Sequence, residues 1–234
     1  MNWSVRAADT EMLDQPGIPF EAIRQNMQEL AVINRWLGGH RISIGACKAL
    51  VAGRRSFSIV EIGSGGGDNL DAIARWAARQ QKQMKGSGID INPECVQYAA
   101  GRFPAFGFIH ADYRDAAFNQ QPDIIFSSLF CHHFSSEDLV TQLRWMYRQC
   151  RVGFFINDLH RHPVAYHSIK WLTRFFSRSA LVRNDAPISV RRGFSRRDWM
   201  QIISQAGIPE VSVSWKWAFR WCIMVKKSGG GEQH

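Results

Sequence analysis

Long hydrophobic runs are absent from this chain of 234 residues. Its apolar residues come in runs of about ten or fewer, whereas a helix that spans a bilayer needs roughly 20. The first residues, MNWSVRAADTEMLDQPG, carry acidic side chains and lack the apolar segment of a secretory signal. We therefore expect a soluble, cytoplasmic protein with no membrane span.

Cysteine is scarce as well. The five cysteines are scattered and never form a C-x-x-C pair, which argues against a disulfide framework and against a structural zinc site. We expect buried, reduced thiols. The chain also lacks internal repeats and low-complexity tracts, except at residues 228–234, where three consecutive glycines predict a flexible tail.

Acidic residues are fewer than basic ones, 20 against 29, which gives a formal charge of +9. Such a charge suits nucleic acid, anionic lipid or an acidic small molecule as a partner. Because the basic residues are spread along the chain rather than massed, a solubilising surface explains them equally well. With 45% hydrophobic residues, the chain is expected to form one domain around one core.

Strand and helix patterns alternate along the chain, which predicts an α/β fold with a mostly parallel sheet. Strands are expected at residues 57–62, 86–91, 107–110, 123–129, 152–158, 211–215 and 221–226, the last two as an antiparallel hairpin. Helices are expected at residues 19–37, 42–52 and 68–80, and from Ser195 to Gly207. We divide the chain into an N-terminal helical extension (1–52), a main domain (53–227) with an inserted lid segment (164–193), and the tail.

A glycine-rich loop, E-I-G-S-G-G-G-D, follows the first predicted strand. A dinucleotide-binding fingerprint would need glycine where Asp68 stands. Asp68 would also repel a phosphate placed at the start of the next helix. Asp90 closes the second predicted strand, where a carboxylate accepts hydrogen bonds from ribose hydroxyls. These features together predict an adenosine-like ligand without phosphates.

The successive motifs S-I-V-E-I-G-S-G-G-G-D, G-I-D-I-N-P, H-A-D-Y and D-I-I-F-S-S-L-F-C-H-H-F resemble those of class I S-adenosylmethionine-dependent methyltransferases. The resemblance covers residues 57–227 and is strongest to the small-molecule branch that includes ubiquinone and menaquinone methyltransferases. The stretch A-V-I-N-R-W-L-G-G-H is similar to the N-terminal helix of bacterial methyltransferases of polyketide or pigment pathways. It implies a Rossmann-like, seven-stranded sheet with N-terminal and inserted lid helices. The implied reaction transfers a methyl group from S-adenosylmethionine to a small aromatic or polyketide-derived metabolite, on oxygen in preference to carbon.

The resemblance also implies which residues hold each part of the cofactor. The methionine part would contact Gly63, Ser64 and Gly65, with Glu61 supporting this loop. Ser127 and Leu129, at the end of the fourth strand, would lie under the methionine amino group and the sulfonium. The ribose and adenine would contact positions after the second and third strands: Asp90, Ile91, Asp112 and Tyr113.

Two adjacent histidines, His132 and His133, follow the fourth strand at the ligand-binding edge of the sheet. Histidine titrates in the range suited to a general base, so we expect His133, assisted by His132 or Asp158, to take the acceptor's proton. A structural hydrogen-bonding role is the alternative for each histidine. We expect no metal, although further histidines follow Asp158, because simple methyl transfer needs none.

The segment 164–193 mixes aromatic and basic residues and, with the N-terminal helix, is expected to roof an apolar pocket for a small-molecule acceptor. The expected acceptor-binding residues are His160, Arg161, Tyr166 and Trp171. Arginines and aromatics also suit RNA, but no separate RNA-binding module is present, so nucleic acid is disfavoured. Two alternatives stay open: an RNA or protein methyltransferase that uses the basic surface, and a non-catalytic cofactor-binding partner subunit. The sequence does not specify the oligomeric state.

Overall fold

The computed structural model describes residues 2–15 and 17–227 of the chain, so the predicted tail lies outside the described residues. Its centre is a seven-stranded sheet in the order β3-β2-β1-β4-β5-β7-β6. The strands are β1 (Ser56–Ile62), β2 (Gln83–Asp90), β3 (Gly107–His110), β4 (Ile124–Ser128), β5 (Gly153–Leu159), β6 (Val211–Lys216) and β7 (Arg220–Lys226). β1 to β5 are parallel, β7 is antiparallel to both β5 and β6, and the predicted Rossmann-like fold is thereby confirmed.

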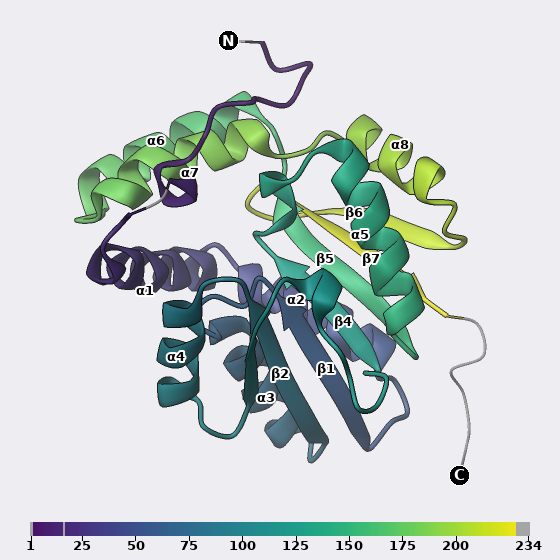
Figure 1. Ribbon diagram of the computed structural model, residues 1–234. Coiled ribbons are helices and arrows are strands. Elements are labelled where there is room, and N and C mark those ends of the chain that lie inside the picture. The colour runs from purple at the N-terminus through teal and green to yellow at the C-terminus, as the bar shows by residue number, and fades with distance from the viewer. Residues whose placement is uncertain (1, 16, 228–234) are drawn as a thin grey trace.

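Helices cover both faces of this sheet (Figure 1). Helices α2 and α3 pack with one face around Ile59 and Phe126, and α5 and α8 pack with the other around Phe154. The helices, with three short 3-10 turns, are η1 (Met12–Asp14), α1 (Phe20–Trp36), α2 (Gly39–Leu50), α3 (Asp68–Arg79), α4 (Pro93–Arg102), η2 (Tyr113–Asp115), η3 (Cys131–His133), α5 (Ser136–Gln149), α6 (Pro163–Phe176), α7 (Ala180–Arg192) and α8 (Arg196–Ala206).

Local sequence explains several helix boundaries. Ser195 and Asp198 form the predicted capping box at the start of α8, and Gly207 ends that helix with a φ of +67°. Gly38, with a φ of +80°, separates α1 from α2, which begins at Gly39, earlier than predicted. Gly39 allows this close helix junction because a Cβ there would lie 1.7 Å from Asn34 Oδ1.

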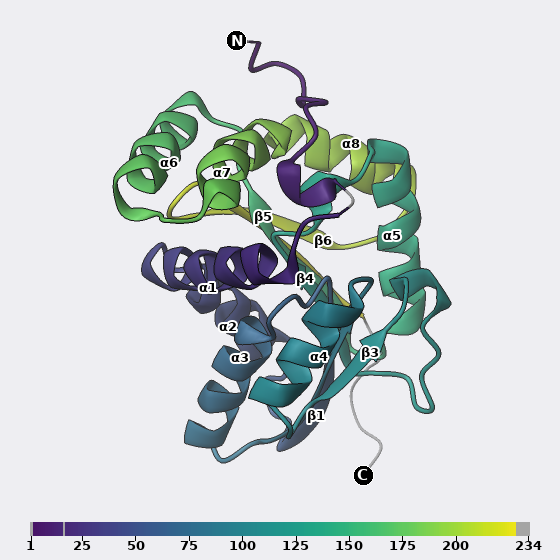
Figure 2. The same ribbon diagram turned by 60° about the vertical axis from the view of Figure 1, so that its left-hand side comes forward.

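A second group of helices lies over the carboxyl ends of the parallel strands. Figures 1 and 2 show α6 and α7 side by side above α1, with the N-terminal segment running across them. This segment, residues 2–15, is fixed to α7, because the peptide N–H groups of Met12 and Leu13 both donate to Asp185. Within the described part of the chain, no helix is long and apolar enough to cross a membrane.

Candidate functional site

The glycine-rich loop joins β1 to α3 at the carboxyl edge of the sheet. Gly63, Gly65 and Gly67 have positive φ angles of +65°, +48° and +76°, which side chains other than glycine rarely adopt. A Cβ on Gly63 would lie 2.2 Å from the ring of Phe130. The loop is therefore tightly turned and closely packed against the segment that follows β4.

Carboxylates surround this loop. Asp90, at the end of β2, accepts hydrogen bonds from the peptide N–H groups of Gly65 at 2.8 Å and Asn92 at 2.9 Å. Burial raises the pKa of Asp90, and burial together with the nearby charge of Asp68 raises the pKa of Glu61. A cationic ligand would relieve this concentration of negative charge, whereas a phosphate would add to it.

Two buried polar atoms beside the loop lack a hydrogen-bond partner among the described residues: Glu61 Oε2 and Ser64 Oγ. Buried polar atoms of this kind are normally satisfied, so both mark places where a ligand's polar groups would bind. An ammonium and a ribose fit these atoms and Asp90. The residues present therefore fit S-adenosylmethionine, the cofactor that the sequence implies.

The expected adenine-binding positions lie on the outer part of the same edge. Ile91 is 70% exposed, so its side chain is free to pack on a ring. Asp112 forms an ion pair with Arg114, whose hydrogen bond lowers the pKa of the carboxyl group. Tyr113 is buried against the ring of Trp145, and burial raises its pKa to about 12, so its position here is in the core.

The end of β4 and Leu129, which follows the strand, connect the glycine-rich loop to a neighbouring cavity. Ser127 is fully buried, with Oγ 3.4 Å from the sulfur of Cys131. Leu129 has a φ of +55° and lines a cavity of about 390 Å³. Most of the other cavity-lining side chains are apolar, including Leu30 and Ile33 of α1, Leu37 just after it, and Ile169 and Leu172 of α6.

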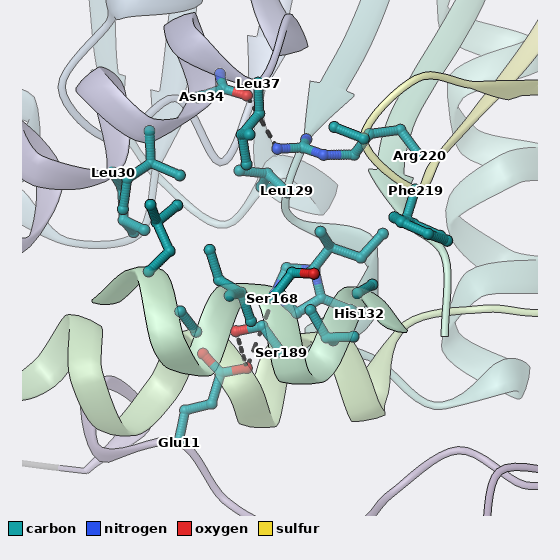
Figure 3. A pocket seen from close by; sticks show the side chains of 18 of the residues that line it. Glu11, Leu30, Asn34, Leu37, Leu129, His132, Ser168, Ser189, Phe219 and Arg220 are labelled. Atoms are coloured by element: carbon teal, nitrogen blue, oxygen red, sulfur yellow. Dashed lines mark hydrogen bonds and ion pairs between the residues drawn. The ribbon is translucent and has the colours of Figure 1, made fainter. Parts of the chain in front are cut away.

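Helix α1 contacts both the glycine-rich loop and this cavity. Met27, in its middle, lies against the glycine loop, with its sulfur 3.7 Å from where a Cβ of Gly65 would stand. Further along, Leu30 of the same helix and Leu37, the residue after it, line the cavity, as Figure 3 shows. The N-terminal helix therefore covers the cofactor loop as well as the cavity that the sequence expected it to roof.

A buried histidine and carboxylate stand at the cavity wall. His132 Nδ1 lies 2.8 Å from Asp158 Oδ1, and both side chains are almost wholly buried. The second oxygen of Asp158 accepts hydrogen bonds from the peptide N–H groups of Phe130 and Cys131. Burial opposes the charge of Asp158, but His132 and these surroundings lower its pKa to about 2. Asp158 is therefore a fixed negative charge that orients the His132 ring.

His133 and Glu11 lie beside this pair. His133 Nδ1 is 3.2 Å from Asp14 Oδ1, and although burial opposes the change, the bond to Asp14 raises the pKa of His133. Glu11 Oε1 is 3.8 Å from His132 Nε2. In the described part of the chain, Glu11, His132 and His133 bring three potential metal ligand atoms within 4.8 Å of one another. Arg192 Nη1 lies 3.6 Å from Glu11 Oε1, so a positive charge already stands beside this carboxylate.

Sequence reasoning missed two charged residues of the cavity, Glu11 and Arg220. Arg220 is buried, its Nη2 donates to Asn34 Oδ1 at 3.1 Å, and its Nη1 has no hydrogen-bond partner within the described residues. Burial lowers its pKa to about 10, which keeps the side chain cationic at neutral pH. In Figure 3 the Asn34–Arg220 pair and the Glu11–Ser189 pair lie apart, with apolar side chains between them.

The four expected acceptor-binding residues do not line this cavity. Arg161 is buried but turned away, bonded to the carbonyl oxygens of Trp3 and Gly193 and paired with Asp198 at 2.9 Å. These expectations relied on proximity along the chain to β5 and α6. The other three lie beside the cavity lining: Tyr166 against Trp3, Trp171 on the outer surface, and His160 against Trp215 and Trp221.

Comparison with known proteins identifies a family for the central part of the chain. Residues 59–153, which run from β1 to the start of β5, match the family model described as "Methyltransferase domain". The chain therefore carries a methyltransferase domain. Among curated proteins, none matches this chain.

Several solved structures share the fold. Human N-acetylserotonin methyltransferase in complex with SAM is 20% identical, with a TM-score of 0.61 over 89% of this chain and 56% of its own. The plantazolicin methyltransferase BpumL, in complex with a triazolic desmethylPZN analog and SAH, is 13% identical, with a TM-score of 0.70 over 89% of this chain and 91% of its own. An O-methyltransferase family 2 protein from Planctomyces limnophilus, complexed with apigenin, is 13% identical, with a TM-score of 0.53 over 74% of this chain and 51% of its own.

Proposed function

We propose that this chain, an S-adenosylmethionine-dependent methyltransferase, methylates an ionisable hydroxyl group on a small, largely apolar metabolite of aromatic or polyketide type. The observation that carries the proposal is the His132–Asp158 pair at the wall of an apolar cavity that also reaches Leu129. The ligands named in the related structures, apigenin and a plantazolicin analog, are in keeping with such an acceptor.

On the cofactor side, the glycine-rich loop and the carboxylates around it would bind S-adenosylmethionine. Glu61 and Ser64 offer unpaired polar atoms to the methionine part, and Asp90 offers its carboxylate to the ribose. When bound, S-adenosylmethionine supplies the methyl group, which passes to the acceptor oxygen as its bond to sulfur breaks. The protein contributes alignment and the exclusion of water, for which Met27 and the cavity wall are placed.

On the acceptor side, we assign the general base to His132 in preference to His133. Asp158 holds the Nδ1 hydrogen of His132, which leaves Nε2 to take the hydroxyl proton. The imidazolium that forms is stabilised by Asp158 and by Glu11, whose carboxylate lies 3.8 Å from Nε2. His133 also lines the cavity, but its bond to Asp14 and raised pKa favour a protonated, structural role.

Arg220 completes the acceptor side. Its unpaired Nη1 lies in an apolar surrounding, where a hydrogen bond to an anionic oxygen is stronger than in water. A phenolate or enolate oxygen, or a carbonyl conjugated with it, would satisfy this donor. Arg220 therefore favours acceptors that become anionic when His132 removes the proton.

The test is methyl transfer from labelled S-adenosylmethionine to a panel of phenols and enolisable polyketides, with the product identified by mass spectrometry. His132→Gln should lower kcat by roughly 10²–10⁴-fold, as expected for removal of a general base. His133→Gln is the matched control and should retain most activity. Labelling of RNA or protein with no labelling of any small acceptor would overturn the proposal, as would equal losses in the two variants.

A further inference from the structure

Large apolar side chains are exposed on one face of the molecule. Trp171, Phe175 and Phe176 of α6 are 56%, 71% and 81% exposed, and Trp171 and Phe175 are stacked on one another. Trp36 at the end of α1 and Trp217 in the β6–β7 turn are 80% and 74% exposed. We call these five residues the aromatic rim. Single exposed apolar residues are ordinary, but a group of this size marks an interaction site.

The aromatic rim lies where the acceptor cavity reaches the surface. Trp217 belongs to the rim and also lines the cavity. Leu37 and Leu172, which line the cavity too, are the chain neighbours of Trp36 and Trp171. Figure 2 shows α6, the far end of α1 and the turn between β6 and β7 together at the left-hand side. An apolar molecule could thus pass from whatever covers the rim into the cavity.

Basic side chains accompany the rim. Lys170, Arg174 and Arg178 are exposed along and just beyond α6, and the sequence of α6 contains no acidic residue. Arg35 and Lys216 are exposed beside Trp36 and Trp217. Helices with bulky apolar residues and flanking lysine and arginine bind at the interface of anionic membranes, where the rings enter the headgroup region and the cations contact lipid phosphates.

We propose that the aromatic rim docks the enzyme on the surface of an anionic lipid bilayer, so that a membrane-dissolved acceptor enters the cavity directly. The docking is independent of the proposed function, while the entry of the acceptor rests on it. Charge decides against a second copy of the chain as the occupant, because two such faces would bring like charges together. RNA is a poorer fit because Trp171 and Phe175 are stacked on each other, which uses ring faces that bases would need.

The test is sedimentation of the full chain with vesicles of phosphatidylcholine, with and without phosphatidylglycerol, in the absence of any acceptor. Wild type should bind the anionic vesicles at least tenfold more tightly than the neutral ones. The variant Phe175→Ser with Phe176→Ser should lose at least tenfold of this binding. Met200→Ser on α8, where the residue is 48% exposed away from the rim, is the matched control and should bind as wild type does.

Three results would overturn the proposal. Unchanged vesicle binding in the double variant would show adsorption by net charge alone. A wild-type dimer that the double variant converts to monomers would assign the rim to a second copy. Tighter binding to single-stranded RNA than to vesicles, lost in the same variant, would assign it to nucleic acid. Because vesicle binding is measured without an acceptor, failure of the methylation assay leaves this test intact.

Discussion

Replacing Asp158 by Asn tests the acceptor side of the site most directly. One oxygen of the carboxylate accepts the Nδ1 hydrogen of His132 and the peptide N–H of Leu159, and the other accepts two further peptide N–H groups. An Asn side chain has only one oxygen, so its NH₂ group must face donors on one side. If the amide donates to Nδ1, His132 takes the tautomer with hydrogen on Nε2, which cannot accept the acceptor's proton. We expect kcat to fall roughly 10²–10⁴-fold.

The same substitution should change stability in a defined pH window. The folded-state pKa of Asp158, about 2, lies below its ordinary value of 3.8, so the charged carboxylate stabilises the fold above pH 3.8. This difference corresponds to about 2 kcal/mol at neutral pH, and it is lost as pH falls from 3.8 toward 2. Asn also leaves buried donors unpaired, which raises the total cost to about 3–5 kcal/mol.

Urea unfolding between neutral and acid pH, together with steady-state kinetics, measures both effects. Asp123→Asn is the matched control, because Asp123 is also buried but binds Ser58 and Arg151 at the opposite end of the strands. It should lower stability and leave kcat unchanged. A folded Asp158→Asn variant with kcat within about threefold of wild type, against the loss expected for a general base, would refute the role given to His132.

Five further substitutions test the rest of the site and its surroundings. Asp90→Ala should weaken binding of S-adenosylhomocysteine roughly 10–150-fold by calorimetry, since hydrogen bonds to a charged group are lost. Arg220→Met should raise the acceptor KM by at least roughly tenfold and leave S-adenosylhomocysteine affinity unchanged, because Arg220 lines the cavity and the variant removes its charged donors. Arg161→Ala should cost about 3–5 kcal/mol in thermal or urea unfolding, as it breaks a buried ion pair, whereas Trp171→Ala, on the surface, should stay within about 0.5 kcal/mol. Burial lowers the pKa of His160 from 6.5 to about 4, so between these pH values the folded state binds fewer protons than the unfolded state. Stability should therefore fall as pH drops from 6.5 to 4. This part of the loss should be absent in His160→Gln.

Most of the residues that we expect to bind the cofactor could be chosen from the sequence. They lie at the ends of strands, and the sequence pattern locates those strands. Gly63 and Leu129 come directly after a parallel strand and Asp90 ends one, and parallel strands bring their carboxyl ends to one edge. The sequence predicted the first and last residues of the strands less accurately. β2 begins at Gln83 rather than at residue 86, because pairing with β1 extends the strand through Gln83, Met84 and Lys85, which include a single apolar residue.

The acceptor side of the site was harder to predict because segments that are far apart in the sequence form it. Glu11 belongs to an N-terminal stretch without periodicity, and it reaches the cavity because the two residues after it bond to Asp185 of α7. Arg220 follows a turn in which Phe219 has a positive φ, and its pairing with Leu159 places it at the carboxyl edge of β5. Conversely, Arg161 stands next to that edge in sequence, but its side chain turns to carbonyl groups outside the cavity.

The charges of the two halves are opposite, and this division favours binding of the two reactants that we propose. Around the glycine loop, Glu61, Asp68 and Asp90 create a negative environment that favours a cation such as a sulfonium. In the cavity, the unpaired Nη1 of Arg220 favours an anion such as a phenolate. In the transfer that we propose, both charges are neutralised, so the attraction acts on the bound reactants and does not itself stabilise the transition state. The neutral products then lose the electrostatic attraction that held each reactant, so the same arrangement that brings the reactants together also promotes release of the products.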